Sequence, residues 1–273
     1  MPLVRPVLIL CLGLATLVAS AQAQKPAELQ FDQNHGAWTA VLRACVQGDR
    51  FDYKALSLDR AKLDQYLGAL QSVTREEFEL WSKEQRYAFW INAYNAYTIH
   101  LVAKSYPLDS IKDLGGLFKS PWDKPFIPLG HLFPDGVTKE LTLNNIEHDV
   151  LRTKFKDARV HAAINCASRG CPSLRKEAFI AEKLGTQLDE QVRAWLADAT
   201  RNRFDREKSK AQVSEIFSWF KADFVRDGGS VREWIAKYAP EEHAAWLRDT
   251  KKDVDLSYLD YSWKLNDIER PKR

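Results

Sequence analysis

The segment KEQRYAFWINAYNAYTIHLVAK, residues 83–104, decides the fold of this chain. Its apolar side chains lie almost all around a helical axis, and a helix of this kind belongs in the middle of a domain. Ser82 and Gln85 fit a capping box, in which two side chains bond the free amides at a helix start. Pro107 ends the helix. The sequence therefore predicts a long central helix around which the other elements pack.

Two asparagines interrupt the apolar surface of this helix. Asn92 and Asn95 are three residues apart and therefore share one face. Buried amides are costly unless they are hydrogen-bonded. Two interpretations stay open: the amides tie neighbouring loops to the helix, or they line the wall of a binding pocket.

The elements on both sides of the central helix are mainly helical. Amphipathic spacing and capping residues predict helices at residues 38–46, 59–70, 145–155, 184–196, 215–225, 231–238 and 240–248. Asn144 is expected to cap the third of these. Short strands are predicted at residues 126–129, 140–143 and 254–265, with a hairpin at residues 202–214. The expected fold class is α+β, a helix-dominated single domain with a small, mainly antiparallel sheet.

The segment RVHAAINCASRGCPSL, residues 159–174, predicts where a functional site lies. Residues 160–164 form a short, mostly apolar run of the kind that makes a buried strand. This run leads into a loop that a glycine and a proline punctuate and that carries Cys166 and Cys171. Because sites are often built on loops at the ends of rigid elements, we expect a site here.

The first 23 residues have the pattern of a secretory signal peptide. Arg5 precedes an apolar run at residues 7–18, and residues 21–23 (AQA) supply the small residues of a cleavage site. The run is too short and wrongly flanked for a stable membrane span. The sequence therefore predicts that residues 24–273 form the mature protein, a single globular domain, in the periplasm or outside the cell.

The composition argues against several classes of partner. Among 273 residues, 40 Lys and Arg are well mixed with 37 Asp and Glu, for a net charge of +3. No basic block indicates nucleic-acid binding, and no later segment is long and apolar enough to span a membrane. The expected partner is a small molecule or a peptide of unknown identity, and no cofactor is expected.

Cysteine use is sparse. Cys11 leaves with the signal peptide, so Cys45, Cys166 and Cys171 remain. Among three thiols at most one intrachain pair can form. Cys45 lies on the apolar stripe of the helix at residues 38–46, where the expected role is a small buried hydrophobe.

Five motifs carry a resemblance to a known family. In chain order they are WINAYNAYTIHLV, LTLNNIEHDVLR, RVHAAINCASRGCPSL, SEIFSWFKADF and YLDYSWKLND. Over residues 38–267 the chain resembles the family named domain of unknown function 547. The resemblance implies one domain over this length, with these residues at its motif positions: Asn92, Asn95, Glu147, His148, Arg159, His161, Cys166, Cys171 and Pro172. The family has no settled activity to transfer, and its plant relatives are described as candidate disulfide oxidoreductases.

Four interpretations of the cysteine loop stay open, and the first is nucleophilic catalysis. Cys166 then needs a base or a cationic neighbour to form its thiolate. In a straight strand His161 and Cys166, five residues apart, point to opposite faces. This geometry favours His148, on the preceding helix, as the partner of Cys166.

The other three interpretations need no histidine base. Cys166 and Cys171 could form a disulfide, which is structural when stable and redox-active when strained or exposed. With His148 and His161 they offer the ligand types of zinc, although a C-x4-C spacing lies at the edge of the usual range. The loop could also bind a protein partner without any chemistry.

We adopt a thiol-dependent hydrolase or acyl transferase as the predicted function, with a non-catalytic interaction domain stapled by the disulfide as the main alternative. The expected catalytic residues are Cys166, His148, His161 and Glu147. On its helix Glu147 diverges from His148 by about 100°, so it could instead pair with Arg152 or Arg159. The expected binding residues are Asn92, Asn95, Arg159, Asn165 and Arg169, and no metal ligand is assigned.

Overall fold

The computed structural model describes residues 30–116, 120–249 and 251–268. The chain divides into two units, residues 1–30 and residues 31–273. All the described helices and strands lie in the second unit. The predicted signal peptide and its cleavage site lie outside the described residues. Within the described ranges, no helix is long and apolar enough to cross a membrane.

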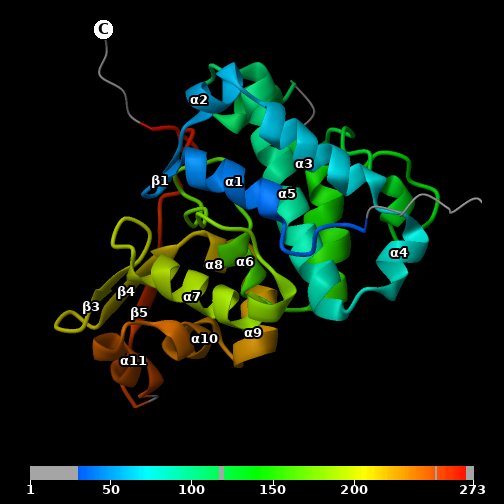
Figure 1. Cartoon of the computed structure of the whole chain (residues 1–273). Helices are drawn as coiled ribbons and strands as arrows, with labels where there is room; N and C mark the ends of the chain where they lie inside the picture. Colours follow the sequence, from blue (N-terminus) through cyan, green and yellow to red (C-terminus); the bar gives the residue numbers. More distant parts are fainter. Residues whose placement is uncertain (1–29, 117–119, 250, 269–273) are drawn as a thin grey trace, which may run out of the picture. The chain divides into compact units, whose positions relative to one another are not determined.

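Helix α5 (Lys83–Ser105) forms the centre of this unit (Figure 1). Residues 87–99 are buried without interruption, so every side of the helix is covered, as predicted. Both halves of the capping box formed by Ser82 and Gln85 are present. Helix α5 contacts α2 (Tyr53–Leu58), α3 (Ala61–Ser72), η4 (Asn145–Phe155) and the short 3₁₀ helix η5 (Ala181–Lys183).

Helix α1 (Gly36–Cys45) confirms the amphipathic helix predicted at residues 38–46. The other N-terminal elements are α4 (Arg75–Leu80) and the antiparallel pair β1 (Val46–Gln47) and β2 (Arg50–Phe51). Helix α1 contacts α3 and buries Trp38, Val41, Leu42 and Cys45. Burial, together with the charge of Asp52, raises the pKa of the Cys45 thiol to about 11. Cys45 therefore behaves as a buried hydrophobe at neutral pH, as expected.

The predicted strands at residues 126–129 and 140–143 are not formed as a sheet. In the described structure these segments meet through a single antiparallel bridge between Ile127 and Leu141. Short 3₁₀ turns occupy much of this region: η1 (Ile111–Leu114), η2 (Pro121–Asp123) and η3 (Gly130–Leu132). Leu141 of this bridge lies just before the next helix in the chain.

That helix, η4, has π-helical hydrogen bonding, which is rare and is often found at functional sites. The predicted cap, Asn144, makes no capping hydrogen bond from its side chain. Instead, the Thr142 hydroxyl accepts a hydrogen bond from the Asn145 backbone N–H at 3.0 Å, and the Asn145 side chain accepts one from the Thr142 N–H at 3.0 Å. The bounds of η4 therefore match the predicted helix at residues 145–155, but Thr142 rather than Asn144 bonds the free amide at its start.

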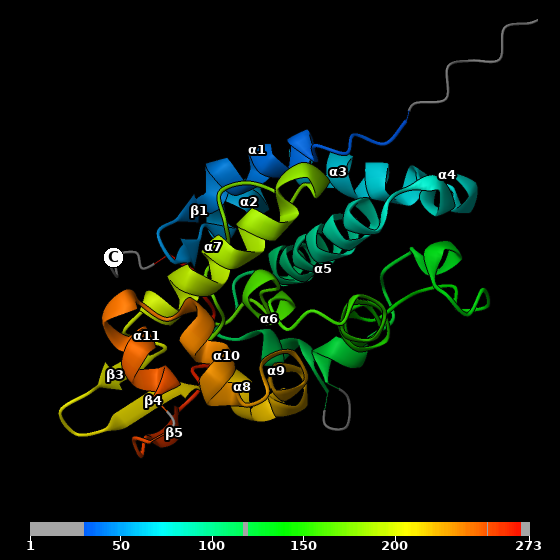
Figure 2. The same ribbon diagram turned by 90° about the horizontal axis from the view of Figure 1, so that it is seen from below.

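The C-terminal part combines helices with a three-stranded sheet (Figure 2). Helix α7 (Leu184–Ala197) precedes the predicted hairpin of β3 (Arg203–Asp205) and β4 (Lys210–Ser214), and β5 (Asp255–Leu259) completes the sheet. Four helices separate β4 from β5: α8 (Ile216–Trp219), α9 (Lys221–Gly228), α10 (Val231–Tyr238) and α11 (Glu241–Arg248). They supply the long crossover that a parallel pair requires, and β5 runs parallel to β4. The fold is helix-dominated α+β, as predicted, with the small antiparallel sheet β1–β2 and this mixed sheet, in which β3 and β4 are antiparallel.

The strand predicted at residues 160–164 is wrong. Residues Val160–Ala163 form a short helix, α6, and the Ile164 N–H donates to the Val160 carbonyl at 3.0 Å. Ala163 is buried in the hydrophobic core around α5, whereas Ala162 is buried in a second core formed by the C-terminal helices. A helical turn presents successive side chains to both cores. A short apolar run cannot by itself distinguish this arrangement from a buried strand.

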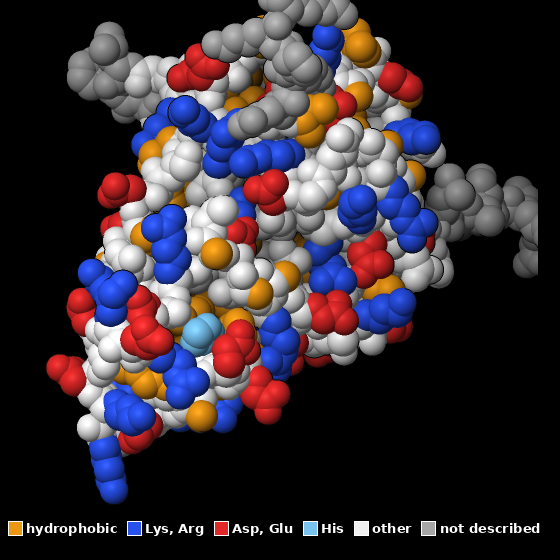
Figure 3. Space-filling model, turned by 90° about the vertical axis from the view of Figure 1, so that its left-hand side faces the viewer, with side chains coloured by type: hydrophobic (Ala, Val, Ile, Leu, Met, Phe, Trp, Pro, Cys, Tyr) orange, Lys and Arg blue, Asp and Glu red, His pale blue; other side chains and the backbone are white. Residues whose placement is uncertain are grey.

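The surface carries charges of both signs. On the face shown in Figure 3, Lys and Arg side chains lie among Asp and Glu side chains. This mixture agrees with the nearly balanced composition of 40 basic and 37 acidic residues.

Candidate functional site

The segment that follows α6, residues 164–172, carries both cysteines of the predicted site and is termed the dithiol loop. The Sγ atoms of Cys166 and Cys171 lie 2.7 Å apart, and both thiols are free. The disulfide of the alternative interpretation is therefore not formed in this structure, although a disulfide needs only a closer approach, to about 2.05 Å. Cys171 is buried and Cys166 is partly exposed.

Side-chain amides hold the dithiol loop in place. Asn165 Oδ1 accepts from the Ala167 N–H at 2.7 Å, and Asn165 Nδ2 donates to the Pro172 carbonyl at 2.7 Å. Asn95, on α5, accepts from the Asn165 N–H at 2.8 Å and donates to the Ala163 carbonyl at 2.9 Å. The central helix thus fixes the start of the loop.

Asn92 makes the same pair of bonds to a different segment. Its side chain donates to the Phe179 carbonyl at 2.7 Å and accepts from the Phe179 N–H at 3.0 Å. The side chains of Asn92, Asn95 and Asn165 therefore bond backbone groups. Of the two interpretations of the helix asparagines, the structure shows the tying of loops to the helix.

The hydrogen bonds around the two sulfurs are asymmetric. Cys171 Sγ is 3.0 Å from the Cys166 backbone N–H donor, 3.0 Å from Tyr261 Oη and 3.4 Å from Ser168 Oγ. Burial alone would raise the pKa of the Cys171 thiol, but hydrogen bonds from Cys166, Ser168 and Tyr261 lower it to about 6. The hydrogen bond to Cys171 and burial raise the pKa of Cys166. These hydrogen bonds favour the anion on Cys171, whereas the sequence interpretation placed it on Cys166.

Tyr261 is a site residue that the sequence reasoning missed. It follows β5, and its ring covers the dithiol loop so closely that a Cβ on Gly170 would lie 2.6 Å from the ring. Its hydroxyl also lies 2.7 Å from Ser168 Oγ and 3.2 Å from Cys166 Sγ. In the sequence, the one indication of Tyr261 was its position in the YLDYSWKLND motif, which does not indicate what the residue does.

A cavity of about 170 Å³ opens beside the sulfurs. Its lining residues belong to, or directly flank, α5, η2, η4, α6, the dithiol loop, α8 and the C-terminal segment: Tyr94, Trp122, Asn144, Glu147, His148, His161, Ile164, Cys166, Cys171, Ile216, Trp219, Phe220, Tyr261 and Trp263. All four predicted catalytic residues are thus brought to one cavity. Its aromatic residues were not predicted as part of the site.

Neither histidine in the cavity hydrogen-bonds a sulfur among the described residues. His148 Nδ1 accepts from Arg152 Nη1 at 2.8 Å, and His161 Nε2 donates to Asp223 Oδ2 at 2.9 Å. Burial, the largest effect, lowers the pKa of both histidines. The expected pairing of Cys166 with His148 is not seen, and the argument that placed His161 on the opposite face fails because α6 is a helix.

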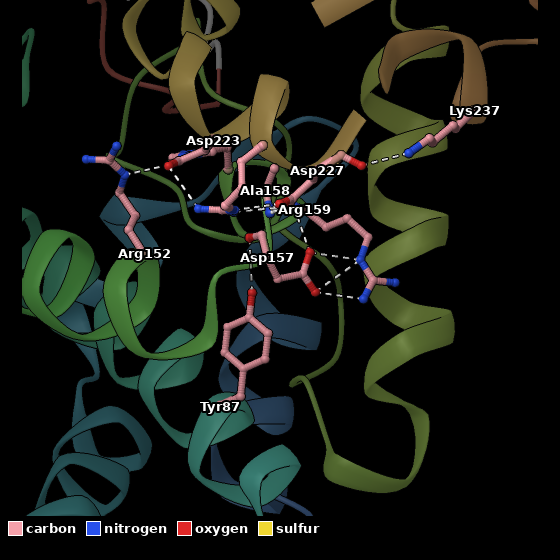
Figure 4. Close-up of polar contacts among 10 residues, drawn as sticks. Tyr87, Arg152, Asp157, Ala158, Arg159, Asp223, Asp227 and Lys237 are labelled. Carbon is pink, nitrogen blue, oxygen red and sulfur yellow. Dashed lines mark hydrogen bonds and ion pairs between the residues drawn. The ribbon is translucent and has the colours of Figure 1, made fainter. Parts of the chain in front are cut away.

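Glu147 is buried and hydrogen-bonds Tyr94 rather than an arginine. Its Oε2 accepts from the Tyr94 hydroxyl at 3.1 Å. Burial raises the pKa of the Glu147 carboxyl to about 7, although the Tyr94 hydrogen bond opposes the shift. Of the two predicted partners, Arg152 bonds Asp223 and Arg159 bonds Asp157, as Figure 4 shows.

The two arginines among the expected binding residues have structural contacts. Arg159 forms ion pairs with Asp157 and Asp189, both at 2.7 Å. Arg169 donates from Nε to the Leu265 carbonyl at 3.3 Å, which ties the dithiol loop to the C-terminal segment. Neither lines the cavity beside the sulfurs.

The zinc interpretation has no support from the geometry. Across residues 30–116, 120–249 and 251–268, no group of three or more His, Cys, Asp or Glu is arranged to hold a metal ion. One ring nitrogen of each histidine is already hydrogen-bonded, His148 Nδ1 to Arg152 and His161 Nε2 to Asp223.

The fold and site define a helix-dominated α+β protein with a dithiol and two neutral histidines in one aromatic cavity. Residues 78–196, which include α5, η4 and the dithiol loop, match the family described as "Protein of unknown function, DUF547". The chain therefore resembles this family, as predicted. No curated protein and no solved structure matches the chain.

Proposed function

We propose that the protein is a thiol–disulfide oxidoreductase whose reactive group is the Cys166–Cys171 pair. The observation that carries this proposal is the 2.7 Å contact between two free sulfurs that line one cavity. A movement of less than about 1 Å would bring them to bonding distance. The proposal takes up the redox alternative of the sequence analysis.

The proposed exchange conserves atoms and electrons. The Cys171 thiolate attacks one sulfur of a substrate disulfide, whose S–S bond breaks and releases one substrate thiolate. The Cys166 thiol then gives up its proton, which the released thiolate can accept, and attacks Cys171 Sγ. A Cys166–Cys171 disulfide forms and the second substrate thiolate leaves. Two electrons pass from the protein to the substrate, and the reverse reaction oxidises a substrate dithiol.

The hydrogen bonds to Cys171 favour a reversible couple over a structural staple. Donors that stabilise a thiolate stabilise the reduced state and make the disulfide more oxidising. The hydrogen bonds that lower the pKa of Cys171 therefore shift the couple towards a higher reduction potential.

Acyl transfer or hydrolysis remains a second candidate because of one observation. Asp223 orients His161 from one ring nitrogen, while the same histidine lines the cavity that holds the Cys171 thiolate. An oriented histidine beside a thiolate is the arrangement of cysteine nucleophiles. We rank this function second because the described residues show no hydrogen bond between histidine and sulfur.

We also propose that the protein acts in the periplasm or outside the cell. The support is the apolar run at residues 7–18 followed by the AQA sequence at residues 21–23. An oxidising compartment would supply the disulfides with which the pair exchanges.

A redox titration tests the function. The protein is equilibrated in glutathione buffers of graded potential, quenched by alkylation, and its free thiols are counted by mass spectrometry. We expect a two-electron transition between about −270 and −120 mV, the range of thiol–disulfide oxidoreductases. Tyr261→Phe should shift the transition to more negative potential because a thiolate donor is lost, whereas Tyr258→Phe, on β5 and 36 % exposed, should leave it unchanged.

Two results would refute the proposal. A pair that glutathione buffers cannot reduce would be a structural staple. A pair that stays reduced at every potential would exclude thiol–disulfide exchange and leave only the nucleophilic function of the thiolate.

A further inference from the structure

Arg152 and Asp223 determine which ring nitrogen carries the hydrogen in the two cavity histidines. Arg152 Nη1 donates to His148 Nδ1 at 2.8 Å. Arg152 Nε donates to Asp223 Oδ2 at 2.6 Å (Figure 4). The same Asp223 oxygen accepts from His161 Nε2 at 2.9 Å. A guanidinium group only donates and a carboxylate only accepts. The bond from Arg152 therefore specifies the hydrogen position on His148, and the bond to Asp223 specifies it on His161.

The two histidines consequently offer opposite hydrogen-bonding groups. His148 accepts at Nδ1, so its neutral ring carries a hydrogen on Nε2 and can donate. His161 donates from Nε2, so its neutral ring has a lone pair on Nδ1 and can accept. Among the described residues, neither His148 Nε2 nor His161 Nδ1 has a hydrogen-bond partner, and both rings line the cavity.

The charges around the cavity favour an uncharged ligand. The Cys171 thiolate and the partly ionised Glu147 carboxyl contribute negative charge. Arg152, the nearest cation in the hydrogen-bond network, already bonds Asp223 and His148. Lys112 and Arg152 also lie against two of the lining rings, 3.8 Å from Trp263 and 4.8 Å from Phe220, so charges of both signs surround the cavity. A neutral group with both a donor and an acceptor complements the histidine pair without adding a further charge.

The size of the cavity favours one part of a larger molecule. Its volume of about 170 Å³ is below the roughly 300–1,000 Å³ of sites that enclose a whole small-molecule ligand. Phe220, Trp219 and Trp263 line it, and Trp219 and Trp263 stack with ring centroids 5.7 Å apart. These rings suit an apolar side chain next to a polar group.

We infer that the cavity binds one residue of a polypeptide through its backbone amide, with the carbonyl oxygen accepting from His148 Nε2–H and the amide N–H donating to His161 Nδ1. This inference rests on the proposed thiol–disulfide exchange and deepens it, because it names the substrate as a disulfide of a protein or peptide. A cysteine in a polypeptide has an amide on each side. Binding of one such amide therefore places its sulfur near the thiol pair.

Equilibrium binding of a matched pair of thiol-free probes tests this inference. The first probe is the capped dipeptide acetyl-Ala-Phe-amide, and the second replaces the N–H between Ala and Phe by an ester oxygen. Binding to the reduced full-length protein is followed by NMR titration of the tryptophan indole N–H signals. The ester cannot donate to His161, so we expect it to bind about tenfold more weakly than the amide.

Histidine variants assign the effect to the two rings. In His161→Phe the difference between amide and ester should fall to less than twofold. In His148→Phe both probes should bind several-fold more weakly, with the difference retained. His243→Phe is the matched control, because His243 lies on α11 and does not line the cavity, and it should bind both probes as the wild type does.

The outcomes separate this inference from the proposed function. Equal binding of the two probes by the wild type, absence of binding, or a difference that survives in His161→Phe would overturn the amide site, whatever the redox titration shows. Conversely, a tenfold preference for the amide in a protein whose thiols do not titrate would support the amide site and overturn thiol–disulfide exchange.

Discussion

Replacing Asn95 with Ala should lower the stability of the protein and also raise the pKa of the Cys171 thiol in the dithiol loop. Asn95 makes two hydrogen bonds to buried backbone, one to the Ala163 carbonyl and one from the Asn165 N–H. Each backbone group left unpaired costs about 1–3 kcal/mol, so the free energy of unfolding should fall by about 2–6 kcal/mol. The loop then loses its fixed start, the donors to Cys171 lose their positions, and the pKa of that thiol should rise.

Asn92→Ala is the control for this variant. Asn92 lies on the same helix, and its two bonds join the Phe179 backbone instead of the loop. Urea melts should show a similar loss of stability at an unchanged m-value. The pH dependence of iodoacetamide alkylation should show a raised thiol pKa in Asn95→Ala and a wild-type pKa in Asn92→Ala. Equal thiol pKa values in the two variants would refute the role of Asn95 in positioning the loop, and a loss below about 1 kcal/mol would refute the hydrogen-bond estimate.

Three further outcomes are expected. Trp90 is 2 % exposed, so Trp90→Ala should lower the free energy of unfolding by about 3–5 kcal/mol in urea melts, and a loss below about 1 kcal/mol would contradict its burial. Burial raises the pKa of Glu147 from 4.5 to about 7, so between these values the folded protein holds a proton that the unfolded chain has lost. The stability that this group contributes is therefore lost as pH rises through that window. Urea melts should show that the free energy of unfolding falls by about 3 kcal/mol between pH 4.5 and 7.5, and that Glu147→Gln removes this fall. An equal fall in the variant would disprove the assignment of the raised pKa to Glu147. Alkylation of Cys171 should increase through about pH 6 and that of Cys45 only near pH 11, while superimposable profiles would contradict the hydrogen-bond asymmetry.

The parts of the fold that the sequence predicted are those specified by local patterns. Helix α5 was recognisable from its continuous apolar surface and its capping box, and α1 from one apolar stripe. The closeness of Cys166 and Cys171 was predictable because a short loop joins them. The segment Val160–Ala163 was misassigned because a run of this length fits a buried strand and a buried helical turn equally well.

The parts of the site that were missed depend on contacts between distant segments. Tyr261 lies 90 residues beyond Cys171, and it reaches the sulfurs because a helical crossover makes β5 parallel to β4. Asp223 lies 62 residues beyond His161, and no spacing rule connects a residue of α9 with one of α6. The protonation of the histidines and the position of the thiolate follow from these contacts, so the sequence offered the right residue types without their roles.

Intact-mass spectrometry after addition of glutathione disulfide tests the central claim most directly, because it shows whether the two sulfurs act in succession. In the wild type we expect loss of two hydrogens without a lasting adduct, since Cys166 displaces glutathione from Cys171. In Cys166→Ser we expect a stable glutathione adduct on Cys171, because no second thiol is present to resolve it. An adduct that accumulates equally in the wild type and in Cys166→Ser would show that the two cysteines do not form an exchange pair.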